Sequence, residues 1–599
     1  ERRHHRRDAW LQGYLGYDTI WFEEVADRNG RLALLTFSLD LEEWLNGERV
    51  DSLRAQAIPE WVRFNPVLEE FWQRDESRRQ KMSNPISPSN LATQLANEIA
   101  QRFYDQSGNW RFPETDLLLA NLQEGFRHFR RLNPQRQGEQ QNDYEERLWR
   151  TFYEQIVEDR ADAPSWNDLN DDQRATWLAH QIFRKLPSPG RIYRFWREAE
   201  DFFRDLLREF RQLAARSDNP WRVRRLVLVP DNRGGWHDLT LYDGRWQGRQ
   251  ISLVYIRGLG GFVTASNLAR VLRPEQSANA LQCPPITLED EDTPGQGSPI
   301  TVAQVRELPQ SHAHLAVYNP VIPVEISPLR FRVLVPLEVA SECVDLAVAW
   351  WRERFARVWD RLPLRVGVIA FPRLMPYQAV VEAARNAEDA LTGQEETWLV
   401  REVEHRAGVV ALRLRRPDGR ETLRVVPMTL PDGREDVFYP YIAVEDRRVR
   451  FPRDFQHPNG QVYRHVADLQ PGDGIKVAPA RIKTLFMDST AARFDTTPPR
   501  YLEEWVHMRE VWALLQRVAP NQTAVQRLRS ELARLEKNWR SPQGDMEAQT
   551  DLWRDTLRAL LAHHLEAKDA ELETLTEAAM QGVLQWALDW HMTALKETV

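Results

Sequence analysis

The alternation of apolar and polar residues divides the chain into helical and strand-rich segments. Residues 31–39 form an apolar run of strand length, and the residues after Asp40 have helical spacing. We therefore expect a strand that ends at a carboxylate and leads into a helix. A Ser cap followed by Pro, at Ser188-Pro189, predicts the start of a long amphipathic helix.

Further along the chain, strands and helices alternate. Strands are predicted over 331–335 and 364–371, and the apolar face between them predicts a helix that extends to Leu362. A second helix is predicted over 377–391. This β-α-β-α order is typical of a ferredoxin-like unit. The polar segment 289–298 predicts a loop.

The fold class expected from these patterns is α+β. We divide the chain into an opening strand and helix (1–54), a helical region (55–218), a small β-rich region (219–310), the β-α-β-α unit (311–395), a second β-rich region (396–499) and a C-terminal helical domain (500–599). A hairpin turn is predicted at Pro417-Asp418-Gly419.

Composition narrows the class of protein. The 599 residues include two cysteines, which excludes a disulfide framework and a four-Cys zinc site. No run of eighteen apolar residues occurs, and the basic first residues precede no apolar stretch, so we expect a cytoplasmic protein without a membrane span. A net charge of −8 argues against a chain that binds nucleic acid over its whole surface.

Almost all of the positive charge is arginine, with seven lysines among the 80 basic residues. The helix after Ser188 carries arginines on its polar side, beginning with Arg191 and Arg194. These side chains are candidates for contact with RNA. The alternative is a solvated face, in which they pair with acidic residues three or four positions away.

Familiar catalytic motifs are missing from the sequence. It contains no phosphate-binding Gly-rich loop with Lys-Ser/Thr, no HExxH, no GxSxG and no CxxC. His4-His5 with Asp8, and His237 with Asp238, lack the further ligands that a metal-dependent phosphohydrolase needs. We therefore predict no catalytic residues, no bound metal and no cofactor.

Asp40 is the most suggestive acidic residue. A carboxylate at the end of a first palm strand is where nucleotide polymerases and cyclases hold Mg²⁺. Two-metal chemistry needs at least one more carboxylate on a neighbouring hairpin, so Asp40 is interpreted as a vestigial metal ligand.

Several segments together resemble the large subunit of type III CRISPR RNA-guided effector complexes. Strand 331–336, the helix behind it, strand 364–370 and the helix that starts at Pro376 resemble the second palm of that family. Residues 31–45 resemble the opening strand and helix of a palm in the same family. The resemblance implies two ferredoxin-like palm domains, and the order of segments is similar to the divergent branch associated with subtype III-C.

The sequence departs from the active members of that family at one decisive place. Active members carry Gly-Gly-Asp-Asp on the hairpin before the strand that starts near Phe331. This chain has Glu325, Ile326, Ser327 and Pro328 there, so the glycines and both metal-binding aspartates are replaced. The resemblance therefore implies a degenerate, inactive cyclase hairpin, as in the divergent branch.

The resulting hypothesis is a structural, RNA-engaging subunit of an antiviral complex. Its partners would be CRISPR RNA, target RNA, backbone RNA-binding subunits and small helical subunits, with no membrane. The candidates for contact with RNA phosphates are Arg330, Arg332, Arg481, Lys483, Arg191 and Arg194.

Two alternatives remain open from the sequence. One is an active palm-type nucleotidyltransferase or cyclase with a rebuilt site that uses Asp40 and Glu325. The other is an unrelated α+β interaction scaffold, since ferredoxin-like units serve many functions.

Overall fold

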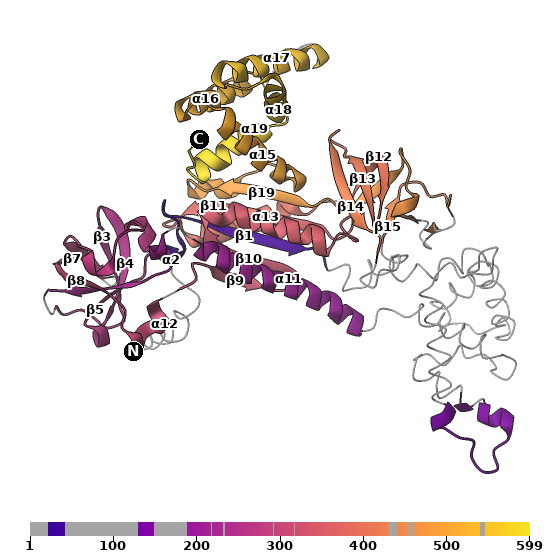
Figure 1. Cartoon of the computed structure of the whole chain (residues 1–599), viewed down its shortest axis with the longest axis horizontal. Coiled ribbons are helices and arrows are strands. Elements are labelled where there is room, and N and C mark those ends of the chain that lie inside the picture. The colour runs from indigo at the N-terminus through magenta and orange to yellow at the C-terminus, as the bar shows by residue number, and fades with distance from the viewer. Residues whose placement is uncertain are drawn as a thin grey trace.

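A computed structural model describes residues 22–41, 130–145, 147–148, 189–216, 219–231, 234–290, 293–316, 318–393, 395–429, 440–451, 454–456, 461–539 and 546–598. Within these residues the chain is α+β, with three β-sheets and a helical C-terminal region (Figure 1). Most of the expected helical region 55–218 lies outside the described residues.

The central sheet has six strands. Their order across the sheet is β20 (Arg500–Tyr501), β19 (Arg481–Phe486), β11 (Leu364–Pro372), β1 (Arg31–Leu39), β10 (Arg330–Pro336) and β9 (Ile322–Ile326). β1 is antiparallel to both of its neighbours, and β19 is parallel to β11. The near-continuous apolar run of β1 is explained by this central place, because both faces of the strand are buried.

This topology places the strand over 31–39 and the strands of the unit 311–395 in one sheet. The strand over 31–39 was assigned to a first palm and the unit 311–395 to a second, but β1 lies between β10 and β11 in one sheet. β10, α13 (Leu337–Arg354) and β11 form a split β-α-β unit into which β1 is inserted. Strand pairing over such a sequence separation leaves no local pattern, so sequence spacing alone could not reveal it.

Helices cover both faces of the central sheet. α11 (Pro189–Ala215) and α13 pack on one face, where Phe37 lies 5.8 Å from Phe210 and 5.9 Å from Phe331 between ring centroids. α14 (Tyr377–Leu391) covers the other face with a stripe of alanines. The second face becomes polar toward the C-terminal end of β1, beyond the alanine stripe.

A second sheet forms a separate β-module on one side of the central sheet (Figure 1). Its strands are β2 (Leu226–Pro230), β3 (Leu241–Trp246), β4 (Arg249–Ile256), β5 (Gly261–Thr264), β6 (Ile286–Asp290), β7 (Thr293–Ile300) and β8 (Val302–Glu307). The segment 289–298 was expected to be a loop, but most of it belongs to the β6–β7 hairpin, whose pairing partners lie close along the chain.

The third sheet lies on the other side of the central sheet (Figure 1). Its order is β14 (Glu421–Pro427), β13 (Val409–Arg415), β12 (Glu396–Arg406), β18 (Gly474–Val477), β15 (Tyr441–Val444), β17 (Val462–His465) and β16 (Phe455–Gln456). The predicted turn at 417–419 joins β13 to β14, and Gly419 has a φ of 84°. β19 was placed in this β-rich region by the sequence analysis, but it leaves this sheet and joins the central one.

The C-terminal region is helical, as predicted. It comprises α15 (Glu503–Val518), α16 (Gln522–Trp539), α17 (Met546–His564), α18 (Asp569–Met580), α19 (Val583–Leu588) and a π-helix (Asp589–Ala594). Trp505 packs against Trp586 and Trp590 at centroid distances of 5.9 Å. In the described part of the chain, none of the helices combines the length and apolar character that a membrane crossing needs.

Candidate functional site

The β9–β10 hairpin forms at the place expected for the cyclase-like turn. Ser327 and Arg330 close it: the Ser327 backbone N–H donates to the Arg330 carbonyl at 2.8 Å, and the reverse bond measures 3.3 Å. The Ser327 hydroxyl also accepts from the Arg330 N–H at 3.1 Å. The turn is thus built on Ser-Pro-Leu-Arg, and it presents no carboxylate.

Asp40 lies where β1 ends, and its carboxylate is already paired. Arg365 Nη2 donates to Asp40 Oδ2 at 2.8 Å, and the two side chains are 16% and 28% exposed. The Arg365 guanidinium therefore compensates the negative charge of Asp40 that a Mg²⁺ ion would otherwise need. The sequence analysis missed Arg365, although a single arginine at the start of an otherwise apolar strand was a usable signal.

Glu325 is also paired with an arginine. Arg332 contacts Glu325 at 3.1 Å. It also donates two hydrogen bonds, of 2.9 and 2.5 Å, to the carboxylate of Glu388 on α14. The hydrogen bonds that Arg332 donates to Glu388 raise the pKa of Arg332 above its usual range. Arg330 approaches the same Glu388 at 3.5 Å and is 46% exposed.

Asp40 and Glu325 do not meet. Glu325 lies opposite Arg332, which is opposite Thr36, whereas Asp40 is four residues beyond Thr36. Four residues of extended chain span roughly 13 Å, too far for two carboxylates to share one metal ion. Among the described residues, no group of three or more His, Cys, Asp or Glu side chains could hold a metal.

The strand register aligns the basic candidates in two rows on the α14 face of the sheet. Arg330, Ser38, Arg365 and Arg481 are successive cross-strand neighbours, and Arg332, Thr36, Gly367 and Lys483 form the next row. Directly opposite residues share a face of a sheet. The structure therefore brings together arginines from β10, β11 and β19 that the sequence had left as separate candidates.

Lys483 is largely buried within the second row. Its ammonium group donates to the carbonyls of Asp495 and Thr497 at 3.1 and 2.8 Å, and lies 3.3 Å from the Asp495 carboxylate. Its side chain is only 6% exposed. These contacts support a structural role for Lys483, because they occupy the donors that an RNA phosphate would need.

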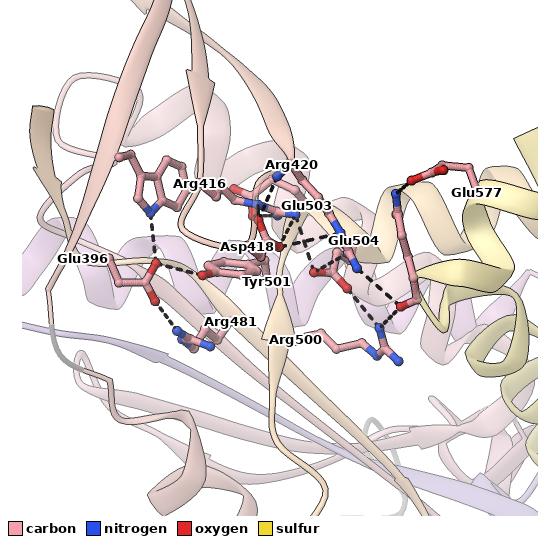
Figure 2. Close-up of polar contacts among 12 residues, drawn as sticks. Glu396, Arg416, Asp418, Arg420, Arg481, Arg500, Tyr501, Glu503, Glu504 and Glu577 are labelled. Carbon is pink, nitrogen blue, oxygen red and sulfur yellow. Dashed lines mark hydrogen bonds and ion pairs between the residues drawn. The ribbon is translucent and has the colours of Figure 1, made fainter. Parts of the chain in front are cut away.

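Arg481 is held in a polar cluster shown on one side of Figure 2. It pairs with Glu396, which also accepts hydrogen bonds from Tyr501 Oη at 2.9 Å and from Trp398 Nε1 at 3.0 Å. Burial, together with the neighbouring Glu396, raises the pKa of Tyr501 to about 12. Arg481 thereby ties β19 to the first residue of β12, between two sheets.

A larger ionic network continues from Tyr501 into the C-terminal helices (Figure 2). Glu504 in the first turn of α15 contacts Arg420 at 3.0 Å, Arg500 at 3.1 Å and Arg416 at 3.7 Å. Acidic residues are favoured at this end of a helix by its dipole. The network joins the β13–β14 hairpin, the edge of the central sheet and α15.

The arginines of α11 mostly pair along their own helix. Arg197 contacts Asp201 at 3.4 Å and Arg204 contacts Glu200 at 2.6 Å, both at i,i+4 spacing. This supports the solvated-face interpretation for that part of the helix. The side chains of Arg191 and Arg194 lie outside the described part of the structure.

Comparison with known proteins finds no family model that matches the chain, and no similar curated protein or solved structure.

Proposed function

We propose that this chain is the structural, RNA-engaging large subunit of a type III CRISPR RNA-guided effector complex, in which a cyclase-like palm is retained without catalysis. One observation carries the proposal. Where a palm would gather carboxylates around metal ions, Asp40 and Glu325 are each paired with an arginine and stand apart from one another.

The arrangement of the central sheet is compatible with this proposal. The β9–β10 hairpin lies beside a central strand, and α13, β11 and α14 follow it in the order expected from the resemblance. The proposal therefore needs one palm, in which β1 shares a sheet with β9, β10 and β11, in place of the two palms expected from the sequence. The finer assignment to the CRISPR family rests on the sequence resemblance.

The RNA-binding part of the proposal centres on the hairpin. Arg330 is the most exposed of the described candidates, and Arg332, Arg481 and Lys483 have strong intramolecular partners. Arg330 would contact a phosphate and position the RNA without reading its sequence. The other three would hold the strands beneath it.

Co-purification tests the assignment. The protein would be purified with the products of its neighbouring genes, and the RNA that accompanies it would be sequenced. Short RNAs that share a constant repeat-derived 5′ tag are the expected result. Random RNA, or none, together with the lack of RNA-binding partner subunits, would contradict the CRISPR assignment.

Charge reversal tests the hairpin. In the assembled complex, Arg330→Glu should weaken RNA binding by about tenfold and lower its salt dependence, because one phosphate contact is lost. Arg401→Glu, on the exposed side of β12, is the matched control. Equal binding by wild type and Arg330→Glu would remove the hairpin from the RNA interface.

A nucleotide assay separates the proposal from its catalytic alternative. The protein would be incubated with labelled ATP and Mg²⁺ or Mn²⁺, with and without target RNA. We expect no oligoadenylate or other transfer product. A product that disappears in Asp40→Asn would instead establish a rebuilt nucleotidyltransferase site.

A further inference from the structure

Three arginines meet at the end of the central sheet opposite to the β9–β10 hairpin. Arg373 follows β11, Arg249 begins β4, and Arg270 ends a short 3-10 helix, Leu268–Arg270. We call them the junction cluster, because they come from the central sheet and from the β-module.

The turn before β1 holds the junction cluster together. Gly30 has a φ of 70°, and its carbonyl accepts from the Arg373 N–H at 2.9 Å. A Cβ on Gly30 would lie 3.3 Å from Arg270 Nη2 and 3.8 Å from Arg373 Cδ. Arg249 Nη1 donates to the Arg28 carbonyl at 2.9 Å. A glycine thus leaves room for guanidinium groups to gather around this turn.

Carboxylates lie near the junction cluster, namely Glu23, Asp27 and Asp243, but among the described residues none of them forms an ion pair with Arg270. Arg373 contacts Glu23 at 3.3 Å, and the acceptor that Arg249 has among the described residues is the Arg28 carbonyl. The side chain of Arg270 makes no hydrogen bond or ion pair to any described residue, and its Nε and Nη1 atoms are buried without an acceptor. Asp27 lies near, but its Oδ1 accepts from the backbone N–H groups of Asn29 and Arg31.

This state of Arg270 is energetically unfavourable. Buried guanidinium donors without an acceptor are costly beside two further positive charges, and an anion that completed the site would stabilise them. Burial and the neighbouring Arg373 and Arg249 lower the pKa of Arg270 to about 10. The lowered pKa reflects the same unfavourable interactions, because they favour loss of the proton that carries the charge.

We propose that the junction cluster binds a phosphate-type oxyanion, with Arg270 as its principal ligand. A guanidinium fork matches two oxygens of a tetrahedral anion, and a modest turn of Arg270 toward Arg249 would direct its unpartnered donors at the ligand. The anion would bridge the β-module and the central sheet. It is either free phosphate or a backbone phosphate of a nucleic acid.

This site is independent of the proposed RNA contact at Arg330. The strand β1 separates the two, with the Gly30 turn at its start and the hairpin at its far end. The experiments can therefore contradict one of the two proposed sites without contradicting the other.

Thermal unfolding and titration calorimetry of the full chain test the site. Sodium phosphate would be compared with chloride at constant ionic strength, for wild type, Arg270→Met and Arg270→Lys. Arg401→Met, whose side chain is 51% exposed on β12, is the control. In the second arm of the experiment, a short single-stranded RNA is titrated in buffer that contains no free phosphate.

Phosphate should raise the unfolding temperature of wild type and of the control, and the increase should level off as the phosphate concentration rises. Loss of a charge-assisted fork should weaken phosphate binding in Arg270→Met by at least about tenfold, and Arg270→Lys should fall between. In phosphate-free buffer Arg270→Met should unfold at a higher temperature than wild type, which a purely structural arginine would not produce.

The RNA arm identifies the source of the anion. If Arg270→Met binds RNA more weakly and phosphate displaces RNA from wild type, the anion is a backbone phosphate. If Arg270→Met binds RNA as wild type does, the anion is free phosphate. No response of wild type to phosphate, or an equal response of Arg270→Met, would overturn the proposal.

Discussion

Asp27 illustrates how strongly burial acts on a single side chain in this fold. Its Oδ1 accepts two backbone N–H groups, at 2.7 Å from Asn29 and 3.0 Å from Arg31, and its Oδ2 is buried without a partner among the described residues. Burial raises the pKa of Asp27 from 3.8 to about 6. The folded state therefore binds a proton more tightly than the unfolded state.

Asp27→Asn should stabilise the protein above pH 6. A raised carboxyl pKa gives stability that is present below pH 4 and is lost as the pH rises through about 6. The amide keeps the Oδ1 acceptor and removes the buried charge, so the gain at pH 8 should be on the order of 2–3 kcal/mol. Urea unfolding of both proteins at pH 4 and pH 8 measures it. A variant that is less stable than wild type at pH 8 would refute this account.

Residue types could be predicted at the candidate site, but their partners could not. Asp40 and Glu325 were visible as unusual carboxylates, and the resemblance drawn from the sequence placed residues 325–328 where active members of that family carry Gly-Gly-Asp-Asp. That Arg365 neutralises Asp40 and Glu388 holds Arg332 depends on the strand register and on how α14 lies over the sheet. Such contacts join residues far apart in sequence, and no local periodicity encodes them.

At the scale of elements, the long apolar strands were the most predictable features. The strand predicted over 31–39 has the bounds of β1, and the helix predicted over 377–391 has those of α14. The helix before β11 was expected to reach Leu362, but α13 ends at Arg354. Trp359 and Leu362 are buried in the turns that follow, so their apolar spacing reflected burial and not a continued helix.

Gly367 leaves room for the side chain of Thr36 on the neighbouring strand β1. A Cβ at this position of β11 would lie 2.5 Å from Thr36 Oγ1 and 4.0 Å from Ala387 Cβ. Gly367→Ala should therefore destabilise the protein by about 1–3 kcal/mol through overpacking. Gly258→Ala, which meets open space, is the control and should be close to neutral.

Thr36→Ala in the same chain tests the cause. If the clash with the Thr36 hydroxyl is responsible, the double variant should be less destabilised than the sum of the two single variants, as measured by urea unfolding. Strict additivity would show that the Thr36 hydroxyl is not the cause of the destabilisation.

At the scale of the whole molecule, the ionic network of Figure 2 connects parts that are distant in sequence. Glu504 is 8% exposed at its side chain and contacts arginines of the β13–β14 hairpin and of β20. Arg420 and Arg500 also approach the carbonyl of Gln581, at 3.4 and 3.5 Å, where α18 ends. The C-terminal helices are thereby fixed to two sheets at once.

Glu504→Gln should loosen this attachment. Removing this buried anion takes a carboxylate from Arg500, Arg420 and Arg416, of which the last two keep Asp418 as a partner, so the cost should be up to about 3 kcal/mol. Hydrogen exchange should increase in α15 and in the β13–β14 hairpin together. Glu510→Gln, on the same helix but with a 71% exposed side chain, is the control. Unchanged exchange in Glu504→Gln would mean that apolar packing alone holds the helices.

The central position of β1 has a consequence for synthesis on the ribosome. β1 is the first described strand, yet its partners β10 and β11 end roughly 300 and 330 residues later. At about 5–20 residues per second, translation leaves this apolar strand without its partners for roughly 15–65 s. Both of its edges are open during that time, and an unpaired apolar strand is a site for aggregation or for chaperone binding. The nascent chain is therefore at greatest risk before residue 372 emerges, and its yield should depend on chaperone supply and on the speed of translation.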